Sequence, residues 1–417
     1  MKKVYISNEN KFVYSILEML KPQLIYIPLK DNELLIKSGD YVYKGDIVAV
    51  NKHDKFPLHS SVSGNVTLIT KKTNLKGEEE DYIVIENDFK EKYKNRLGYK
   101  KDKDIYNYSK EEFIKLLFDM GIIGLSGSGQ KTYKKYSASN IKCLVINAME
   151  CEPYLYCDKA VLYNYTEQLL ECIDAILEIM KIPKAIITIN ENDIKNSNHL
   201  KKYIGSYPNI KVVSTSGAYP IGWERCLIET VFGMKYKNNP IEIGIIVNNI
   251  STIYAIYDAL KYNNPLIEKN ITISGNGIKK NVNVKVKIGS KLSEIIPYVT
   301  EYKNSNNLLF IVGGSMMGKS LVSDDVVVTK NLNSVIIMKN NFLKSSECIN
   351  CGRCAEVCPV KLFPSLILKN IENINKLKKL RVKECIDCGL CSYICPSKIE
   401  INEYTLLAKK KVNNNEI

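Results

Sequence analysis

Short runs of apolar, β-type residues, separated by turn residues, fill the first ninety positions of the chain. Residues 24–28, 44–48 and 61–66 form such runs. Short runs of this kind with frequent turn signals are typical of short β-strands. The pattern therefore predicts a small all-β domain over residues 1–95. Interleaved Lys, Glu and Asp at residues 86–103 indicate a linker or a solvated helix at its end.

From about residue 104 the apolar positions recur every three to four residues. Ser109 stands three positions before Glu112, and an apolar stripe follows up to Gly121. This spacing predicts a helix that begins with a capping box and ends at the glycine. Beyond it, strand-like and helical patterns alternate, with strands expected at 141–146, 185–189 and 210–213 and helices at 159–180 and 222–232. Such alternation predicts an α/β domain over residues 104–240.

The pattern changes twice more along the chain. Strand-like runs predominate over residues 241–340, which predicts a third, mainly β region. In it, strands are expected at 241–248, 271–274, 283–288 and 331–338, and a helix at 252–260. From residue 345 two cysteine-rich runs flank a helical pattern at 365–379, so a small helical domain is expected over residues 341–410. The polar end beyond Lys409 is expected to be disordered.

The composition agrees with a modular globular protein. A chain of 417 residues exceeds one ordinary domain, and 45% apolar with 25% charged residues is typical of globular proteins. No apolar run approaches the roughly 18 residues needed to span a bilayer. The N-terminal residues lack the apolar core of a secretory signal, so a cytoplasmic location is expected.

The net charge of +14 could attract nucleic acid, an anionic membrane surface or an acidic redox partner. However, the lysines are spread over the whole chain, without an Arg-rich arm, zinc-finger spacing or an aromatic-basic RNA motif. A diffuse charge without such a motif does not provide recognition, so no nucleic-acid partner is expected.

Eight of the thirteen cysteines form two copies of the pattern C-x2-C-x2-C-x3-C-P. Three thiolates within seven residues can wrap one face of an iron-sulfur cube, and in two-cluster ferredoxins the fourth Cys of each run binds the other cluster. By this rule the ligands of the first [4Fe-4S] cluster are Cys348, Cys351, Cys354 and Cys395. The ligands of the second are Cys385, Cys388, Cys391 and Cys358.

A pair of structural zinc sites is the alternative interpretation of these cysteines. Zinc sites usually contain two C-x2-C pairs with a longer spacer, rather than three cysteines in seven residues followed by C-P. The spacing therefore favours two [4Fe-4S] clusters. The other five cysteines are scattered and are interpreted as small buried residues, although Cys151 lies in a charged motif.

A glycine-rich loop is the second candidate site. It spans residues 121–129, and Lys134 and Lys135 follow it. Bare backbone N–H groups with ammonium groups nearby can surround a phosphate. The loop lacks the Gly-Lys-Ser/Thr of a P-loop, and no strand runs directly into it as in a dinucleotide fingerprint. By itself it is equally compatible with a flexible turn.

Three further segments give the loop a context. They are Asn147-Ala-Met-Glu150-Cys151-Glu152-Pro153-Tyr154, residues 217–224 around Trp223, and Val247-Asn248-Asn249-Ile-Ser-Thr252. Together with the loop they resemble the flavin and NADH site shared by the C subunit of the Rnf electron-transport complex and the NADH-binding flavoprotein subunit of respiratory complex I. The resemblance to the Rnf protein is the closer and covers nearly the whole chain. It includes the Gly-Gly-Ser-Met-Met-Gly segment at residues 313–318, which is similar to part of a β-grasp domain of the SLBB type.

The resemblance implies a multidomain α/β and α+β protein. Its four parts are a barrel-sandwich hybrid, an α/β domain that binds flavin and NADH, an SLBB-like β-grasp region and a helical dicluster ferredoxin domain. FMN and NADH are the implied ligands of the α/β domain, with the Asn pair at the FMN phosphate and the acidic residues near the nicotinamide nucleotide. The residues that match cofactor-binding positions are Gly124, Gly127, Gly129, Lys135, Asn147, Glu150, Glu152, Glu224, Asn248 and Asn249.

The implied function is that of an Rnf-type C subunit, peripheral on the inner face of the cell membrane. Such a protein passes electrons from NADH through FMN to two clusters, and on to a ferredoxin-type carrier or membrane partners. Two departures leave alternatives open, because Gln130-Lys131 replaces the family's Phe-Pro and Trp223 replaces a small residue. One alternative is a soluble paralogue that feeds a dedicated reductase, of the proline-reductase-associated or cobalamin reductase type. The other is a cluster-only adaptor with a defunct nucleotide site.

Overall fold

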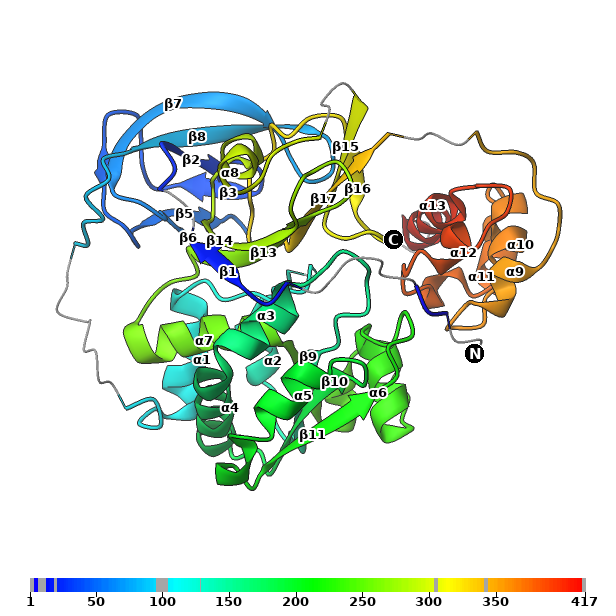
Figure 1. Ribbon diagram of the computed structural model, residues 1–417, viewed down its shortest axis with the longest axis horizontal. Coiled ribbons are helices and arrows are strands. Elements are labelled where there is room, and N and C mark those ends of the chain that lie inside the picture. Colours follow the sequence, from blue (N-terminus) through cyan, green and yellow to red (C-terminus); the bar gives the residue numbers. More distant parts are fainter. Residues whose placement is uncertain are drawn as a thin grey trace.

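The computed structural model describes residues 4–6, 13–18, 21–94, 104–127, 129–303, 307–340 and 344–414. Four units follow one another along these residues: a β unit, an α/β unit, a central sheet with a covering helix, and a helical unit (Figure 1). This order confirms the predicted fold class of a multidomain α/β and α+β protein. Most of the predicted linker, residues 95–103, lies outside the described residues.

Two small sheets facing one another form the β unit. Their strand orders are β2-β8-β7-β4 and β3-β5-β6. The strands are β2 (Leu24–Pro28), β3 (Asn32–Leu34), β4 (Tyr41–Val42), β5 (Ile47–Asn51), β6 (Pro57–His59), β7 (Gly64–Thr73) and β8 (Glu79–Asn87). The alternating pattern of the sequence places apolar side chains such as Ile25, Val48 and Ile85 between the sheets, where they are fully buried.

The α/β unit is built on a parallel sheet of order β11-β10-β9-β12. Its strands are β9 (Cys143–Ala148), β10 (Ala185–Asn190), β11 (Ile210–Thr215) and β12 (Ile245–Asn249). Its helices are α1 (Lys110–Asp119), α2 (Thr132–Tyr136), α3 (Cys157–Asn164), α4 (Thr166–Met180), α5 (Ile194–Leu200), α6 (Glu224–Phe232) and α7 (Ile250–Tyr262). The predicted capping box of Ser109 and Glu112 begins α1. Because the strands are parallel, the loops after their carboxyl ends gather at one edge of the sheet.

Three sequence predictions for this unit are wrong. The predicted domain boundary at residue 240 falls too early, since β12 pairs with β9 and the unit continues to the end of α7. Pro240–Ile243 form a 3-10 turn rather than the start of a strand. The helix expected at 159–180 is divided into α3 and α4, because the Asn164 side chain donates to the Ala160 carbonyl and competes with the backbone of the helix.

The central sheet has the order β1-β14-β13-β17-β15-β16. Its elements are β1 (Ile16–Glu18), β13 (Glu268–Ser274), β14 (Val282–Lys287), α8 (Leu292–Val299), β15 (Leu308–Val312), β16 (Lys319–Leu321) and β17 (Ser334–Lys339). Strand β1 comes from the first twenty residues, pairs with β14 and so forms one edge of the sheet. The predicted 1–95 domain therefore loses this segment, because the edge of the central sheet satisfies its backbone groups.

The helical unit contains α9 (Arg353–Glu356), α10 (Pro364–Lys369), α11 (Ile374–Lys379), α12 (Leu390–Tyr393) and α13 (Ile401–Asn414). The single helix expected at 365–379 is two helices, because Asn373 caps a new start at α11. The expectation of disorder beyond Lys409 is wrong as far as Asn414. Helix α13 continues there because Ala408 and Val412 are buried in the core of this unit.

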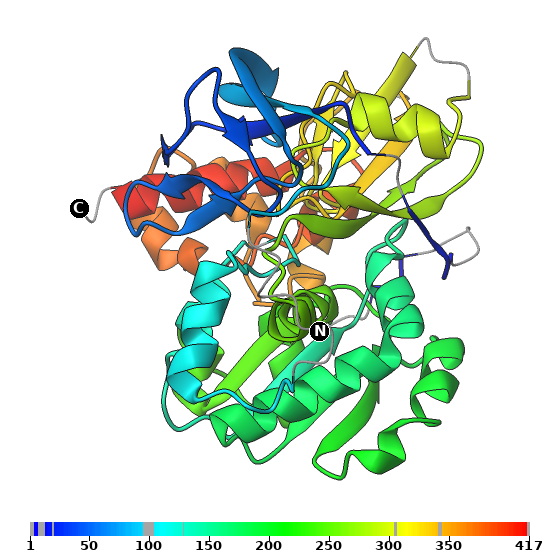
Figure 2. The same ribbon diagram turned by 90° about the vertical axis from the view of Figure 1, so that its left-hand side faces the viewer.

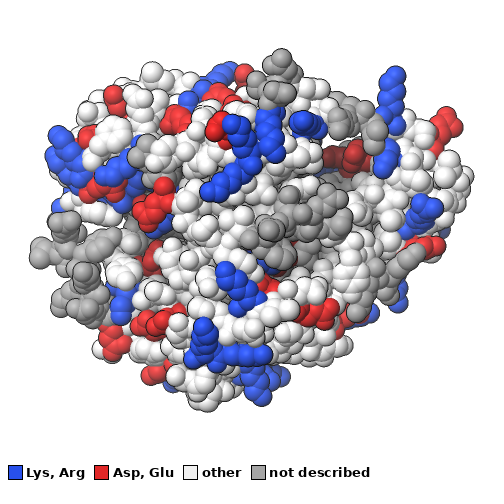
Figure 3. Space-filling view, viewed as in Figure 1, with Lys and Arg blue, Asp and Glu red and all other residues white. Residues whose placement is uncertain are grey.

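The β unit and the central sheet lie together on one side of the molecule and the α/β unit on the other (Figures 1 and 2). The helical unit packs alongside, through a seam that contains Tyr219, Val357, Cys388 and Leu390. Figure 3 shows Lys and Arg side chains scattered among acidic ones over one face of the molecule. Within the described part of the chain, no helix combines the length and apolar character that crossing a bilayer requires.

Candidate functional site

A cavity of about 640 Å³ lies at the carboxyl edge of the parallel sheet, where the central sheet and the helical unit approach it. Nine of the ten predicted cofactor residues line it: Gly124, Gly127, Lys135, Asn147, Glu150, Glu152, Glu224, Asn248 and Asn249. The tenth, Gly129, lies behind Asn331, which is itself a lining residue; a Cβ atom at Gly129 would stand 2.6 Å from the Asn331 Oδ1. The structure thus brings together segments that are up to 125 positions apart in the sequence.

The glycine loop forms one rim of this cavity. It closes on itself through the Gly124 N–H, which donates to the Gln130 carbonyl over 2.8 Å, and Leu125 N–H anchors it to Thr252 of α7. Gly127 adopts φ +95°, and no atom lies within 4 Å of the position that a Cβ would take. A backbone of this kind, open and without side chains, can approach a ligand closely.

The two residues that depart from the family pattern in this loop face in different directions. Gln130 lines the cavity. Lys131 instead turns to the β unit, where its Nζ lies 2.5 Å from the Asp54 carboxylate and over the ring of Phe56. Lys131 therefore ties the loop to the β unit, and of these two residues only Gln130 lines the cavity.

Lys135 supplies a positive charge to the cavity wall. Its Nζ donates to the Val247 carbonyl at the end of β12 over 2.8 Å and lies 3.8 Å from the Glu224 carboxylate. Burial lowers the pKa of Lys135, and Glu224 opposes this shift. A partly buried ammonium group with one carboxylate and one carbonyl nearby is suited to hold an anionic group of a ligand.

Asn147 fixes the turn that follows β9. Its Nδ2 donates to the Gly222 carbonyl over 2.7 Å, and its Oδ1 accepts from the Met149 N–H. Gly222 has to be glycine at this contact, because a Cβ there would stand 2.5 Å from the Met149 carbonyl oxygen. The acidic motif and the segment around Trp223 are therefore held side by side.

The Asn pair lies at the start of α7. Asn248 is buried and donates to the Tyr136 hydroxyl. Asn249 is the N-cap of α7 and donates to Asp158, whose carboxylate also accepts from Ser251 over 2.6 Å. The first turn of a 13-residue helix carries partial positive charge, so this end of the cavity is suited to a phosphate.

The two acidic residues of the motif, Glu150 and Glu152, accept hydrogen bonds from backbone N–H groups. Glu150 accepts from the N–H groups of Asp158 and Lys159 at the start of α3, both over 3.2 Å. Glu152 accepts from the Met316 N–H over 3.2 Å and so holds the Gly-rich segment of the central sheet against the α/β unit. Burial raises the pKa of Glu152 to about 7 and that of Glu150 to about 8, the latter with help from Asp158.

Glu152 is expected to make the stability of the fold depend on pH. Its folded-state pKa of about 7 lies above the ordinary value of 4.5, so the unfolded chain loses the proton first as pH rises. The free energy of unfolding should therefore fall between pH 4.5 and 7, by about 3 kcal/mol from this residue. Glu152→Gln should flatten this dependence in urea unfolding at pH 5.5 and 8. Glu301→Gln at the surface is the control, and equal slopes for wild type and Glu152→Gln would contradict the prediction.

A hydrogen-bonded path joins the cavity to the second cysteine run. The indole N–H of Trp223, a lining residue, donates to the Tyr219 hydroxyl over 3.1 Å. The Tyr219 hydroxyl donates in turn to the Cys388 carbonyl over 2.7 Å, and Tyr219 is fully buried. Asp387, in the same run, lines the cavity directly. The cavity and the second cysteine run therefore share a wall.

Tyr219→Phe is expected to remove the hydrogen bonds that connect the cavity with the second cysteine run. The change leaves the Cys388 carbonyl without its donor and the Trp223 N–H without its acceptor, which should cost about 1 to 3 kcal/mol of stability. A redox titration followed by electron paramagnetic resonance should show an altered potential for the second cluster and an unchanged one for the first. Tyr393→Phe, an exposed tyrosine of the same unit, serves as the control. Unchanged potentials for both clusters would refute a link between the wall and the second cluster.

The two cysteine runs repeat the same backbone. Asn350 and Asp387 hold the second position after the first Cys of their runs, and both adopt φ near +60°. Gly352 and Gly389 follow two positions later with φ of +75° and +74°, and each begins a short helix, α9 or α12. In both runs, residues with left-handed backbone angles stand at the same distances from the first Cys. Both runs therefore form the same loop, which is expected if each surrounds a cluster of the same kind.

The cysteines fall into groups within these loops. Burial first, and then the thiols of Cys388, Cys385 and Cys358, raise the pKa of Cys391. Cys354 and Cys395 pack together in a small cluster with Ile401, and Cys391 packs against this cluster. The backbone N–H groups of Leu362 and Asp387 donate to the sulfur atoms of Cys358 and Cys385 over 3.3 and 3.4 Å. Among the described residues, no three His, Cys, Asp or Glu side chains converge to metal-binding distance.

Several lining residues escaped the sequence analysis: Asp158, Asn331, Asn333, Met317 and Asp387. Asp158 lies six positions after Glu152, and Asp387 lies between two predicted cluster ligands, so proximity in the sequence was the available signal. Asn331 and Asn333 come from the approach to β17, which no local pattern connects with the cavity. The buried Asn333 Oδ1 has no hydrogen-bond partner among the described residues, and is free to accept from a ligand.

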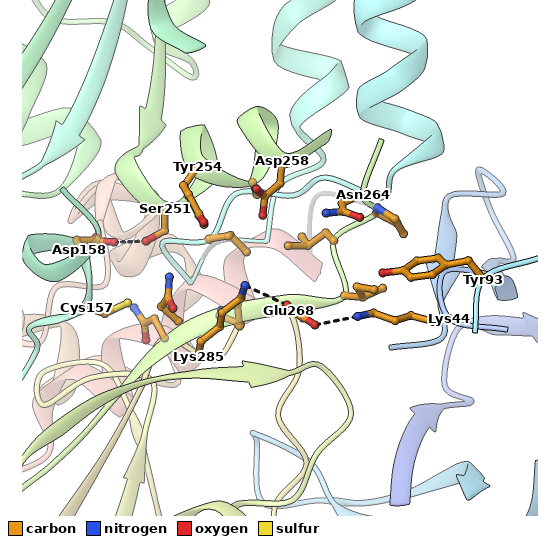
Figure 4. Close-up of a pocket in the computed structure, with 18 residues that line it drawn as sticks. Lys44, Tyr93, Cys157, Asp158, Ser251, Tyr254, Asp258, Asn264, Glu268 and Lys285 are labelled. Carbon is orange, nitrogen blue, oxygen red and sulfur yellow. Dashed lines mark hydrogen bonds and ion pairs between the residues drawn. The ribbon is translucent and has the colours of Figure 1, made fainter. Parts of the chain in front are cut away.

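A second cavity, of about 60 Å³, lies behind Asp158 (Figure 4). On its far side Glu268 of the central sheet pairs with Lys285 over 3.2 Å and with Lys44 of the β unit over 3.4 Å. Although burial opposes ionisation, Lys287 and these two lysines lower the pKa of Glu268 to about 2. This ion cluster joins the units of the protein, and the cavity has room only for water.

The main cavity fits an FMN molecule in its donor set. It offers an open glycine backbone, the Lys135 ammonium group, the Asn147 and Asn248 amides and the N-terminal turn of α7. Amide and ammonium donors suit the carbonyl and phosphate oxygens of a flavin nucleotide, and an unpaired acceptor at Asn333 suits a hydroxyl group. The volume of about 640 Å³ lies within the usual range for cofactor sites.

Three family models match the chain. A model described as the RnfC barrel sandwich hybrid domain matches residues 7–90, and one described as the Nuo51 FMN-binding domain matches residues 117–258. A third, described as a 4Fe-4S dicluster domain, matches residues 344–399.

Similar proteins include the C subunits of two oxidoreductase complexes. The C subunit of an ion-translocating oxidoreductase complex from Vibrio cholerae is 31% identical over 82% of this chain and 46% of its own length. The C subunit of a proton-translocating ferredoxin:NAD(+) oxidoreductase complex from Clostridium ljungdahlii is 29% identical over 83% of this chain and 78% of its own length. This chain thus spans about half the length of the Vibrio relative.

A solved structure also resembles the chain. A crystal structure of an NAD+-reducing [NiFe]-hydrogenase in the H2-reduced state matches with a TM-score of 0.51. The match covers 74% of this chain and 63% of that chain at 16% identity. At this identity the likeness concerns the fold alone.

Proposed function

The chain belongs to the RnfC-like family, and from this premise we propose that it passes electrons from NADH through FMN to two [4Fe-4S] clusters and on to ferredoxin or membrane partners. Its cofactors are FMN and [4Fe-4S] clusters. The activity, the donor and the acceptor are proposals that rest on the residues of this chain.

One observation carries the proposal. The cavity that offers a flavin donor set is lined both by the glycine loop and by Asp387, a neighbour of the predicted cluster ligands Cys385 and Cys388. The proposed flavin site and the second cysteine run thus share a wall, and the hydrogen bond from the Tyr219 hydroxyl to the Cys388 carbonyl links them as well. A cavity that only bound a nucleotide would have no need of this contact.

Different residues of the cavity would bind different parts of FMN and NADH. Lys135 and the start of α7 with Asn249 would hold the anionic part of FMN, while Asn147 and the glycine loop would border its ring. FMN supplies the ability to accept electrons in pairs and release them singly. Glu224, at the start of α6 and 3.8 Å from Lys135, would accept hydrogen bonds from ribose hydroxyls of NADH. Glu152, which the Met316 N–H engages, would shape the same region.

The crossed cluster assignment is also proposed. The first cluster would be held by Cys348, Cys351, Cys354 and Cys395, and the second by Cys385, Cys388, Cys391 and Cys358. Cys354 packs with Cys395, and Cys358 raises the pKa of the Cys388 and Cys391 thiols of the second run; both contacts support this division, while Cys391 also packs against Cys354 and Cys395. The second cluster would then lie next to the cavity, and the first would be the exit.

Anaerobic purification followed by flavin and iron analysis tests the proposal. We expect about one FMN and about eight iron atoms per chain, and bleaching of the flavin absorbance by NADH. FMN that NADH does not reduce would overturn the claim for NADH and leave electron transfer intact. Absence of FMN from a protein with full iron content would overturn the proposed function.

Partners and location follow from the same premise. The Clostridium relative is named as part of a ferredoxin:NAD(+) oxidoreductase complex. We therefore propose a cytoplasmic protein that associates peripherally with membrane subunits, and a ferredoxin-type carrier as its redox partner. Co-purification with membranes that high salt reverses would support this location.

A further inference from the structure

Apolar side chains are exposed on one side of the helical unit. Phe363 and Leu366 expose 55% and 43% of their surface, whereas Pro364 and Ile367 of the same helix are buried. Positions 363, 366 and 369 recur at helical spacing, so Lys369 continues the exposed side of α10. The outer side of α10 thus presents two large apolar groups and one ammonium group to solvent.

This side of α10 is attached to the first cysteine run. The Lys369 Nζ donates to the Asn350 Oδ1 over 2.6 Å. Asn350 follows Ile349, which exposes 66% of its surface, and precedes Cys351, which is exposed too. The apolar residues of α10 therefore lie next to the predicted first cluster, where its ligands come closest to solvent.

Basic residues occur in the same part of the helical unit. Arg353 and Lys361 are exposed, and the Arg381 guanidinium donates to the Lys361 carbonyl over 3.4 Å and lies 3.5 Å from the Glu384 carboxylate. Residues 344–414 as a whole contain thirteen Lys or Arg against seven Asp or Glu, a net charge of +6. Whereas charge elsewhere is mixed, this unit offers an apolar centre with a positive rim.

We propose that this surface, here named the α10 face, docks an acidic redox protein that exchanges one electron with the first cluster. The α10 face comprises the apolar Ile349, Phe363 and Leu366 and the basic Arg353, Lys361, Lys369 and Arg381. The proposal rests on the proposed function, since it requires the cluster. In the transfer, the first cluster is oxidised by one electron, the centre of the partner is reduced by one, and no proton or bond is exchanged.

The apolar centre and the basic rim of the α10 face favour an acidic protein as the partner. An apolar centre with a charged rim is the usual form of a protein interface, and opposite charge on the partner accelerates its arrival. An anionic membrane would also attract lysines and apolar side chains. It would, however, cover the exposed cysteine loop with lipid and close the exit for electrons, so the geometry favours a protein.

Electron transfer to a purified acidic two-cluster ferredoxin tests the proposal, with the full chain carrying its clusters. Stopped-flow reduction of this probe should slow about tenfold or more in Lys361→Glu/Arg381→Glu, and the salt dependence of the wild-type rate should be largely lost. Leu366→Ser should slow it by a similar factor at every salt concentration. Leu68→Ser and Lys71→Glu, both exposed on β7 of the β unit, are the matched controls and should leave the rate unchanged.

The iron content and the electron paramagnetic resonance spectrum of each variant show whether its clusters are present. They therefore distinguish a failure of the α10 face from a failure of the proposed function. Loss of the clusters from the wild type would refute the proposed function. Intact clusters with equal rates in all variants would overturn only the α10 face. Binding of wild type, but not of the variants, to vesicles of phosphatidylglycerol, without any transfer to ferredoxin, would also overturn it in favour of a membrane contact.

Discussion

Cys388→Ala should lower the iron content from about eight to about four atoms per chain, because it removes one ligand of the second cluster. The electron paramagnetic resonance signal of the first cluster should persist. Cys226→Ala, which removes a buried thiol outside both runs, is the control and should retain all the iron. Iron analysis of protein purified without oxygen measures the effect.

Double variants decide which cysteine belongs to which cluster. If the assignment is crossed, Cys358→Ala combined with Cys388→Ala removes two ligands of one cluster, so about four iron atoms should remain. Cys395→Ala combined with Cys388→Ala should then remove both clusters. The opposite result would show that each run holds a cluster of its own.

Lys135→Met should deprive the protein of FMN. The change removes the ammonium group that lies 3.8 Å from Glu224, so this carboxylate would face the anionic cofactor without a compensating charge. A hydrogen bond to a charged group contributes about 1.5 to 3 kcal/mol, which corresponds to a loss of affinity of roughly ten- to hundredfold. Flavin fluorescence after denaturation and titration of the apoprotein with FMN measure the effect.

The neighbouring lysine provides the control for this experiment. Lys134 stands one position earlier, and its side chain is 62% exposed and turned towards Asp54 of the β unit. Lys134→Met should therefore retain FMN. Equal flavin content in both variants would remove Lys135 from the site.

Much of the site could be predicted from the sequence because its chemistry is local. The spacing of Cys348, Cys351 and Cys354 is that of a loop around one cluster, and the structure repeats this loop in the second run with the same left-handed positions. Likewise, the capping box at Ser109 begins the helix that leads into the glycine loop. Side chains within a few positions of one another, and backbone angles set by glycine, do not depend on the rest of the fold.

Contacts between distant segments could not be predicted in this way. From the sequence, Gln130 and Lys131 together alter the nucleotide site, yet Lys131 pairs with Asp54 in another unit and of the two only Gln130 lines the cavity. Glu152 lines the cavity, and the sequence does not show that the Met316 backbone N–H of the central sheet also donates to it. The direction of a side chain depends on which units pack against its own segment, and local periodicity carries no information about that.

The sequence by itself thus determined the cofactor chemistry of this protein: cysteine runs for two clusters and a glycine loop with its acidic and Asn motifs for a flavin. Only the tertiary structure decided that β12 joins the parallel sheet as its fourth strand and that Asp158, Asn333 and Asp387 line the cavity. It also decided that Tyr219 joins this cavity to the second cysteine run, 169 positions away. The reason is physical, since ligand spacing is a property of neighbouring residues, whereas a shared wall arises when apolar surfaces of separate units are buried against each other.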